Sequence, residues 1–172
     1  MTELFETFDD AGNPIGLVER ATVHAQGIWH KSSHIFLFRS DGRLIVQRRA
    51  AGKDLYAGRL DYSVGEHLQP GETHEQAAHR GLQEELDVCG VTLEPLGGIR
   101  RARYEDEALG VKDHEIQQAF RGTYDGPVKP DPIEVADVAS LPLEDIAKLI
   151  DEDPGRFTPW FARELATLGI LR

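Results

Sequence analysis

Two adjacent glutamates, Glu84 and Glu85, lie beside an apolar stripe in a segment with helical spacing. A capping box of Thr73 and Gln76 begins this helix, and its stripe recurs every three or four residues: Ala78, Leu82, Leu86 and Cys89. Adjacent carboxylates repel each other unless a cation lies between them. Their hard oxygen atoms suit Mg²⁺ or Mn²⁺, ions that typically hold substrate phosphates. A solvated acidic face with an Arg80–Glu84 ion pair is the alternative that these residues alone leave open.

The elements that position this helix are predicted from turn residues and side-chain periodicity. Residues 1–30 are expected to form a β-hairpin and a loop that carries His24 and His30, and His34 is expected to begin a strand and to be structural. Further strands are expected over 35–39, 44–48, 60–67, 99–105, 115–124 and 135–141, and C-terminal helices over 143–168. Strands and helices mix without regular alternation, so the sequence predicts an α+β fold.

Length and charge exclude several classes of function. The 172 residues suffice for one domain, and 19 Lys and Arg against 30 Asp and Glu give a net charge of −11. Such an acidic chain is not expected to bind a nucleic-acid polymer, whereas a small phosphorylated ligand bridged by divalent ions is compatible with it. Cys89 is the only cysteine and is expected to be a buried structural thiol. With an acidic N-terminal segment and no long apolar run, these features predict a cytoplasmic protein without membrane association.

The segment around the helix resembles the Nudix box, G-x5-E-x7-R-E-U-x-E-E-x-G-U, in which U is aliphatic. Residues 66–88 match it at Glu72, Arg80, Leu82, Glu84, Glu85 and Val88. The resemblance implies a single Nudix domain over 1–172, an α/β/α sandwich with a mixed central sheet and, here, an N-terminal β-hairpin. It also implies that Glu84 and Glu85 hold a divalent metal, that Glu85 is catalytic and that Glu72 belongs to the box loop.

Three positions depart from the box: Glu66 replaces the first glycine, Gly81 the glutamate after the arginine, and Asp87 the last glycine. In the family, the glutamate at the position of Gly81 is a metal ligand that often helps to activate water. Glycine cannot bind a metal through a side chain, and in a helix interior it is about 1 kcal/mol less favourable than Ala. A rebuilt metal site, weakened hydrolysis and a glycine that merely makes room for a neighbour are all left open.

A larger part of the chain resembles the branch of this superfamily that contains type 1 isopentenyl-diphosphate isomerase. Residues 47–53 are similar to a segment in which an arginine and a lysine hold the diphosphate, here Arg49 and Lys53. Residues 157–160 are similar to a segment whose tryptophan, here Trp160, faces an allylic cation. Arg80 and Arg101 complete the expected substrate-binding residues, although Arg101 could equally lie on a solvent-facing strand edge.

The same resemblance implies a second set of metal ligands. His67, Asp113 and Glu115 lie on matched segments, and Glu115 is also the expected general base in place of the missing box glutamate. His24 and His30 fall near two further isomerase ligands, with a spacing one residue short. Imidazoles mixed with carboxylates suit Zn²⁺ or Mn²⁺ better than Mg²⁺. For any single histidine, a hydrogen-bonded structural role is the alternative.

The isomerase interpretation meets an obstacle at Gly65, which occupies the position of that branch's catalytic cysteine. The sequence therefore favours a metal-dependent hydrolase, a Nudix-type pyrophosphohydrolase that cleaves a diphosphate linkage in a nucleoside-diphosphate-type small molecule by metal-activated water. An isopentenyl-diphosphate isomerase-like enzyme and a weakly active or inactive binder of a diphosphate ligand are the alternatives. A homodimer formed through the N-terminal hairpin is left open.

Overall fold

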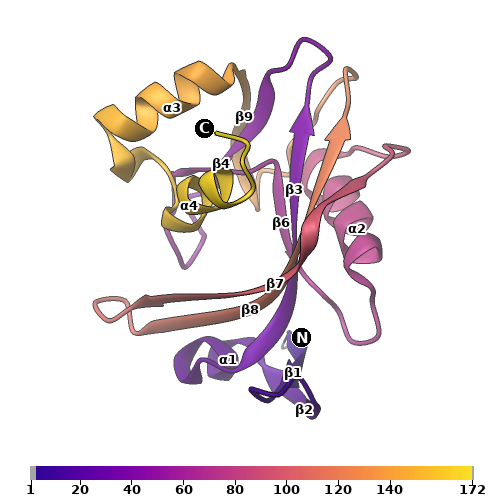
Figure 1. The fold of residues 1–172 in the computed structure, drawn as a ribbon, viewed down its shortest axis with the longest axis vertical. Helices are drawn as coiled ribbons and strands as arrows, with labels where there is room; N and C mark the ends of the chain where they lie inside the picture. The colour runs from indigo at the N-terminus through magenta and orange to yellow at the C-terminus, as the bar shows by residue number, and fades with distance from the viewer. Residues whose placement is uncertain (1–2, 172) are drawn as a thin grey trace.

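Within residues 3–171, which this computed structural model describes, nine strands form one mixed sheet that lies between helices (Figure 1). The strands are β1 (Leu4–Phe8), β2 (Pro14–Glu19), β3 (Trp29–Phe38), β4 (Leu44–Arg49), β5 (Leu60–Asp61), β6 (Val64–His67), β7 (Glu94–Asp106), β8 (Val111–Thr123) and β9 (Val135–Leu141). The helices are α1 (Arg20–Gln26), α2 (His74–Leu86), α3 (Leu143–Glu152) and α4 (Pro159–Thr167), with a short 3₁₀ helix η1 (Pro154–Arg156) before α4. The predicted α+β architecture is confirmed.

The long strand β3 organises the sheet around the site. It pairs in parallel with β8, with His30 opposite Glu115, and antiparallel with β6, with Ser32 opposite His67. Side chains alternate between the two faces along a strand, so residues directly opposite each other share a face. Strands β3, β6 and β8 therefore present their polar side chains together at one end of the sheet.

The two faces of the sheet carry separate apolar cores. Ile35 and Leu37 of β3 belong to the core on the α2 face, whereas Phe36 and Phe38 belong to the core on the face of α3 and α4. In Figure 1, α2 lies on one side of the sheet and α3 and α4 on the other, while α1 and the β1–β2 hairpin close the lower end. The even-numbered residues of β3 thus face α4, and this is the face on which the site forms.

The predicted histidine-containing loop is wrong, because residues 20–26 form α1 and His30 already lies within β3. Helix α1 has no side-chain cap at Glu19, so its start has no capping signal in the sequence. It ends at Gly27, whose φ of 68° is left-handed and whose amide donates to the Val23 carbonyl. Burial of Val23 and His24 against the rest of the protein stabilises this short helix.

Two further expectations need correction. Helix α2 has the predicted capping box, but it ends at Leu86 because Asp87 adopts a left-handed φ of 56°. Cys89 consequently lies beyond the helix and is exposed, so it is not the expected buried thiol. The strand expected over 60–67 is broken into β5, which pairs with β4, and β6, which pairs with β3, and the hydroxyl of Ser63 between them binds the backbone of both neighbouring strands. None of the described helices is long and apolar enough to cross a membrane.

Candidate functional site

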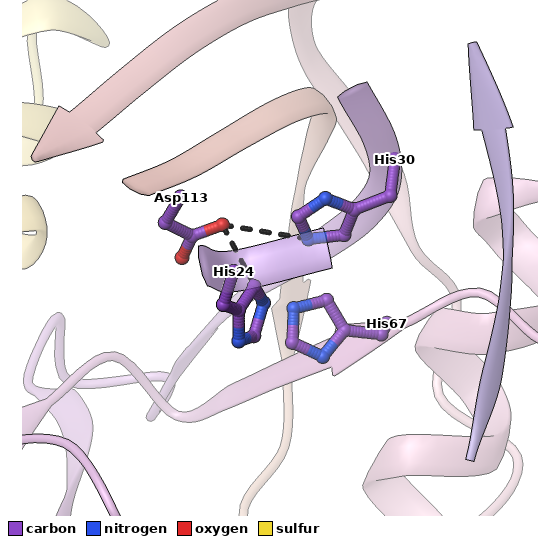
Figure 2. Close-up of side chains that lie close together, drawn as sticks. All are labelled: His24, His30, His67 and Asp113. Carbon is purple, nitrogen blue, oxygen red and sulfur yellow. Dashed lines mark ion pairs between the residues drawn. The ribbon is translucent and has the colours of Figure 1, made fainter. Parts of the chain in front are cut away.

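Three histidines and one aspartate converge from four different elements at the lower end of the sheet (Figure 2). They are His24 of α1, His30 of β3, His67 of β6 and Asp113 of β8. One potential ligand atom from each lies within 4.8 Å of the other three. We call these four residues the histidine cluster. The structure therefore brings together four of the residues that the resemblance implied as metal ligands.

The hydrogen bonding within the histidine cluster fits a bound cation. Nδ1 of His30 lies 3.0 Å from the Ile28 carbonyl, to which it can donate, and this leaves Nε2 as a free lone-pair donor facing Asp113 at 3.4 Å. Among the described residues, Nε2 of His24, Nε2 of His30 and Oδ1 of Asp113 are buried and have no hydrogen-bond partner. Buried polar atoms are ordinarily paired. A divalent cation would satisfy all three atoms at once.

Burial sets the protonation of the histidine cluster. It lowers the pKa of His24 to about 4 and the pKa of His67 well below its ordinary value, so both imidazoles are neutral near pH 7. Burial and the adjacent Glu115 carboxylate raise the pKa of Asp113 well above its ordinary value. Neutral imidazoles and an aspartate crowded by a second carboxylate form a donor set that suits Zn²⁺ or Mn²⁺.

Glu115 lies directly beside the histidine cluster. Its Oε1 is 3.7 Å from Nε2 of His67, and its Oε2 is 3.4 Å from Nε2 of His34. Burial alone would raise the pKa of Glu115, but the positive charge of His34 lowers it below its ordinary value. His34 is charged because Glu164 and Glu115 overcome the effect of its burial and raise its pKa. Glu115 is therefore an ionised carboxylate that can bind a cation or accept a proton.

A cavity of about 850 Å³ extends from the histidine cluster toward α4 and contains the expected diphosphate-binding residues. A register shift in β4 between Arg48 and Arg49 accompanies the placement of Arg49 at this cavity, 3.3 Å from a carboxylate oxygen of Asp61. The Trp160 indole donates to the same carboxylate at 3.0 Å, and Arg49 lies over the Trp160 ring. Lys53 is held in an ion pair with Glu134. Arg49, Lys53 and Trp160 therefore line one connected region.

The arginine of the box is already occupied by carboxylates. Arg80 lies 2.8 Å from Glu72 and 3.2 Å from both Glu66 and Glu84, and it donates to the His67 carbonyl at 2.9 Å. These contacts fix the box loop and the end of β6 to α2. Arg80 thus supports the backbone of one member of the histidine cluster, and its charge is neutralised by its neighbours.

Glu85 lies outside the histidine cluster. It is 8% exposed, accepts a hydrogen bond from Gln47 at 3.1 Å, and burial raises its pKa to about 8. Glu66 lies near it, and burial raises the pKa of Glu66 to about 7. A Cβ atom at Gly81 would lie only 2.8 Å from Val64 and 3.2 Å from an oxygen of Glu66. The side chains of Val64 and Glu66 therefore fill the space that a side chain at position 81 would enter.

Two other positions differ from what the sequence suggested. A Cβ atom at Gly65 would lie 2.4 Å from the ring of Tyr62, so this tyrosine occupies the place of a side chain at position 65. Arg101 donates to the Asp10 carbonyl and lies over the Trp29 ring, which ties β7 to the N-terminal hairpin. Its observed partners thus lie in the loop of the hairpin and at the start of β3, although it also borders the cavity.

Sequence reasoning missed the polar residues that surround Glu115. The sequence predicts a structural role for His34, yet the two-residue spacing of His30, Ser32 and His34 on one strand places all three on the same face. Glu164 follows Trp160 by one helical turn, which places both on one side of α4. Both signals were present in the sequence, but neither indicates a contact with Glu115 without the sheet pairing.

The fold and the pocket define a protein of the Nudix class, with a mixed sheet, a box helix and a polar cavity. The family model for the NUDIX domain matches residues 28–161, and the chain belongs to this family. Among solved structures, DR0079 from Deinococcus radiodurans has a TM-score of 0.70 at 24% identity, covering 88% of this chain and 90% of that one. A MutT protein from Methanosarcina mazei Go1 has a TM-score of 0.64 at 20% identity, covering 82% and 93%. These two structures support the fold.

Curated relatives of similar length indicate the branch of the NUDIX family to which the chain is similar. The chain is 37% identical over 162 residues to an isopentenyl-diphosphate Delta-isomerase from Nocardia farcinica, covering 93% of this chain and 91% of the relative. It is 32% identical over 162 residues to a protein of the same name from Burkholderia multivorans, covering 94% and 90%. The isopentenyl-diphosphate isomerase-like branch, which the sequence indicated, is confirmed.

Proposed function

We propose that the protein binds the diphosphate ester of a short unsaturated alcohol and isomerises it by proton transfer at carbon. The observation that carries this proposal is the position of Glu115, which lies beside the histidine cluster in a cavity that also contains Arg49 and Trp160. The names of the relatives support the same substrate class. The sequence put hydrolysis first and isomerisation second, and the relatives favour the second of these.

Each group in the cavity has a role in this proposal. Arg49 and Lys53 bind the diphosphate, with Asp61 and Glu134 holding them in place beforehand. The histidine cluster would hold a divalent cation, which would supply positive charge next to the reacting groups. Glu115 accepts the proton that leaves one substrate carbon, and the proton added at the other carbon of the allyl unit comes from solvent in the cavity, because position 65 offers no titratable side chain. The ring of Trp160, over which Arg49 already lies, is the aromatic group that would stabilise positive charge developing on the carbon chain.

Hydrolysis of a diphosphate is the second candidate, and Gly65 is the observation that favours it. Moving a proton across an allyl unit needs a donor as well as an acceptor, and position 65 offers no titratable side chain. Burial raises the pKa of Tyr62, which covers this position, well above its ordinary value, so its phenol is a weak acid. In the hydrolytic reaction Glu115 would instead take a proton from water.

Nuclear magnetic resonance in D₂O distinguishes the two reactions in one sample. Isopentenyl diphosphate is incubated with the protein and Mn²⁺ or Mg²⁺, and then ¹H and ³¹P spectra are recorded after the metal is removed. Isomerisation gives an allylic product that contains deuterium and an intact diphosphate. Hydrolysis gives free phosphate or diphosphate, and a panel of nucleoside diphosphates is tested in parallel.

Glu115→Gln serves as the matched variant, because it keeps the size of the side chain and removes the ionisable group. Loss of the deuterated product in this variant supports the proposal. If the wild-type protein releases phosphate without incorporating deuterium, its function is hydrolysis and not the proposed isomerisation. Turnover that persists in Glu115→Gln contradicts the role of Glu115 in either reaction. Stabilisation by the substrate without any product supports a diphosphate binder.

A further inference from the structure

His34 lies between two buried carboxylates that come from distant parts of the chain. Its Nδ1 is 2.7 Å from Oε2 of Glu164, and its Nε2 is 3.4 Å from Oε2 of Glu115. His34 is 2% exposed and Glu164 is 4% exposed. The three side chains form a continuous row from the C-terminal helix α4, through β3, to the end of β8 next to the histidine cluster.

Additional contacts fix Glu164 at one end of this row and the His34 ring in its middle. Arg100 of β7 lies 2.6 Å from Oε1 of Glu164, and Gln117 of β8 donates to the same oxygen at 3.4 Å. The His34 ring also stacks on Tyr62, with ring centroids 4.5 Å apart. These contacts hold the imidazole plane between a carboxylate on each side. The Nε2 atom of His34 therefore faces Oε2 of Glu115 at 3.4 Å and the Ser32 hydroxyl at 3.3 Å.

Stability alone does not account for this arrangement. Burying several charged groups in a row is expensive, and well-packed apolar residues of similar volume are commonly as stabilising or more so. The neighbouring core on this face of the sheet is apolar and could have continued here, since Phe36 and Phe161 pack beside Tyr62. The row differs from that core in one respect, because its far end, Glu115, is the carboxylate next to the histidine cluster.

We infer that Glu164 and His34 are positioning residues, which together fix the Glu115 carboxylate in the orientation that binds the cation and meets the substrate. Glu164 holds the His34 ring, and His34 holds Oε2 of Glu115. The other oxygen of Glu115, Oε1, then faces His67. Outer groups of this kind typically change metal affinity or activity 10- to 100-fold when removed. The effect on turnover rests on the proposed function, whereas the effect on metal affinity does not.

The first experiment measures Mn²⁺ binding to the metal-free protein by isothermal titration calorimetry. Glu164→Leu and His34→Gln are expected to weaken Mn²⁺ binding by about 10- to 100-fold. Glu164→Gln is expected to lose less, because its amide oxygen can still accept from Nδ1 of His34. Arg39→Met is the control: Arg39 is half-buried and binds the Tyr124 and Gly126 carbonyls away from the site. It should lower the melting temperature and leave the Mn²⁺ affinity unchanged.

The second experiment separates kcat from KM on a substrate of the wild-type protein. The Glu164 and His34 variants should lower kcat while KM changes little, because Arg49 and Lys53 still bind the diphosphate. Wild-type affinity for Mn²⁺ in both Glu164→Leu and His34→Gln, with a lowered melting temperature, would show that the row is only structural. If Glu164→Leu fails to fold, Glu164→Gln and His34→Gln decide the question. If the wild-type protein shows no turnover, the proposed function is contradicted. The Mn²⁺ affinity of the variants then remains the test of the positioning role.

Discussion

The histidine cluster and the carboxylates of the box helix region differ in how their charges are satisfied. We call Glu66, Glu84 and Glu85 the box carboxylates. Glu66 and Glu84 each lie 3.2 Å from Arg80, and Glu85 accepts from Gln47. In the histidine cluster, by contrast, three buried atoms from three different side chains have no partner among the described residues.

This difference indicates which of the two regions requires a cation. Arg80 already supplies positive charge to Glu66 and Glu84, so those carboxylates have a counter-charge within the protein. The unpaired atoms of the histidine cluster have none, and they belong to the neutral imidazoles and the carboxylate that cations bind. We therefore expect the tighter divalent-cation site at the histidine cluster and a weaker one at the box carboxylates.

The largest expected effect comes from removing one member of the histidine cluster. His67→Ala should lower the affinity for Zn²⁺ or Mn²⁺ by at least about 100-fold, because removing even the outer groups of metal sites costs 10- to 100-fold. Competition with a chromogenic chelator measures this affinity. His79→Asn is the control, since His79 lies on the outer surface of α2 with a side chain that is 43% exposed. Equal affinity in the wild type and His67→Ala would mean that the cation binds elsewhere.

The next effect concerns Glu85 and the pH dependence of stability. The pKa of Glu85 is raised to about 8, so the folded protein holds this proton more tightly than the unfolded chain does. Its stabilising effect is complete below the ordinary value near 4.5 and is lost as pH rises through about 8. In Glu85→Gln this loss is absent, and the free energy of unfolding should fall less between pH 5 and pH 8, by a few kcal/mol.

Urea unfolding at several pH values, with a chelator present, tests this expectation. Glu84→Gln is the matched control on the same helix, because the Glu84 side chain is 59% exposed and should leave the slope as in the wild type. A Glu85→Gln protein with the same pH dependence as the wild type would rule out Glu85 as its source.

The sequence predicts the region of the box carboxylates better than it predicts the histidine cluster. The box carboxylates lie on or near α2, whose capping box and apolar stripe are local signals, and the structure has that helix. The histidine cluster depends on four elements, and one of them, α1, has no capping signal at Glu19. Its members were implied only through resemblance, because strand pairing between β3, β6 and β8 is not encoded in any short segment.

The departures from the family pattern illustrate the same limit. Glu66 and Gly81 each look like a lost feature when read singly, whereas in space Glu66, together with Val64, fills the volume next to Gly81. Gly65 and Tyr62 form a second pair of this kind. The contact between His34 and Glu164 spans 130 positions, so no local pattern could have indicated it. Such pairs become visible only when the elements are packed together.

A smaller effect tests the exchange between Glu66 and Gly81. Gly81→Ala would place a Cβ atom 2.8 Å from Val64 and should destabilise the protein by about 1 kcal/mol. Overpacking of about 1–3 kcal/mol is only partly offset by the helix propensity of Ala. Adding Glu66→Gly leaves the Val64 contact and removes the 3.1 Å contact with Glu66, so the two changes together should be less destabilising than their sum. Additive effects in chemical denaturation would argue against a shared volume.

The smallest expected effect comes from removing Arg80, so that the box carboxylates lack a partner as the atoms of the histidine cluster do. In Arg80→Met, Glu66 and Glu84 lose the counter-charge that Arg80 provides at 3.2 Å. Carboxylates without that partner should bind Mg²⁺, so millimolar Mg²⁺ should raise the melting temperature of this variant by a few degrees more than that of the wild type. Thermal unfolding with and without Mg²⁺ measures the difference, and His79→Asn, which keeps both Arg80 and the histidine cluster, should behave like the wild type with Mg²⁺. If Mg²⁺ stabilises the wild type as much as Arg80→Met, Arg80 does not satisfy the box carboxylates. The contrast between the two regions would then lie only in the identity of the metal that each binds.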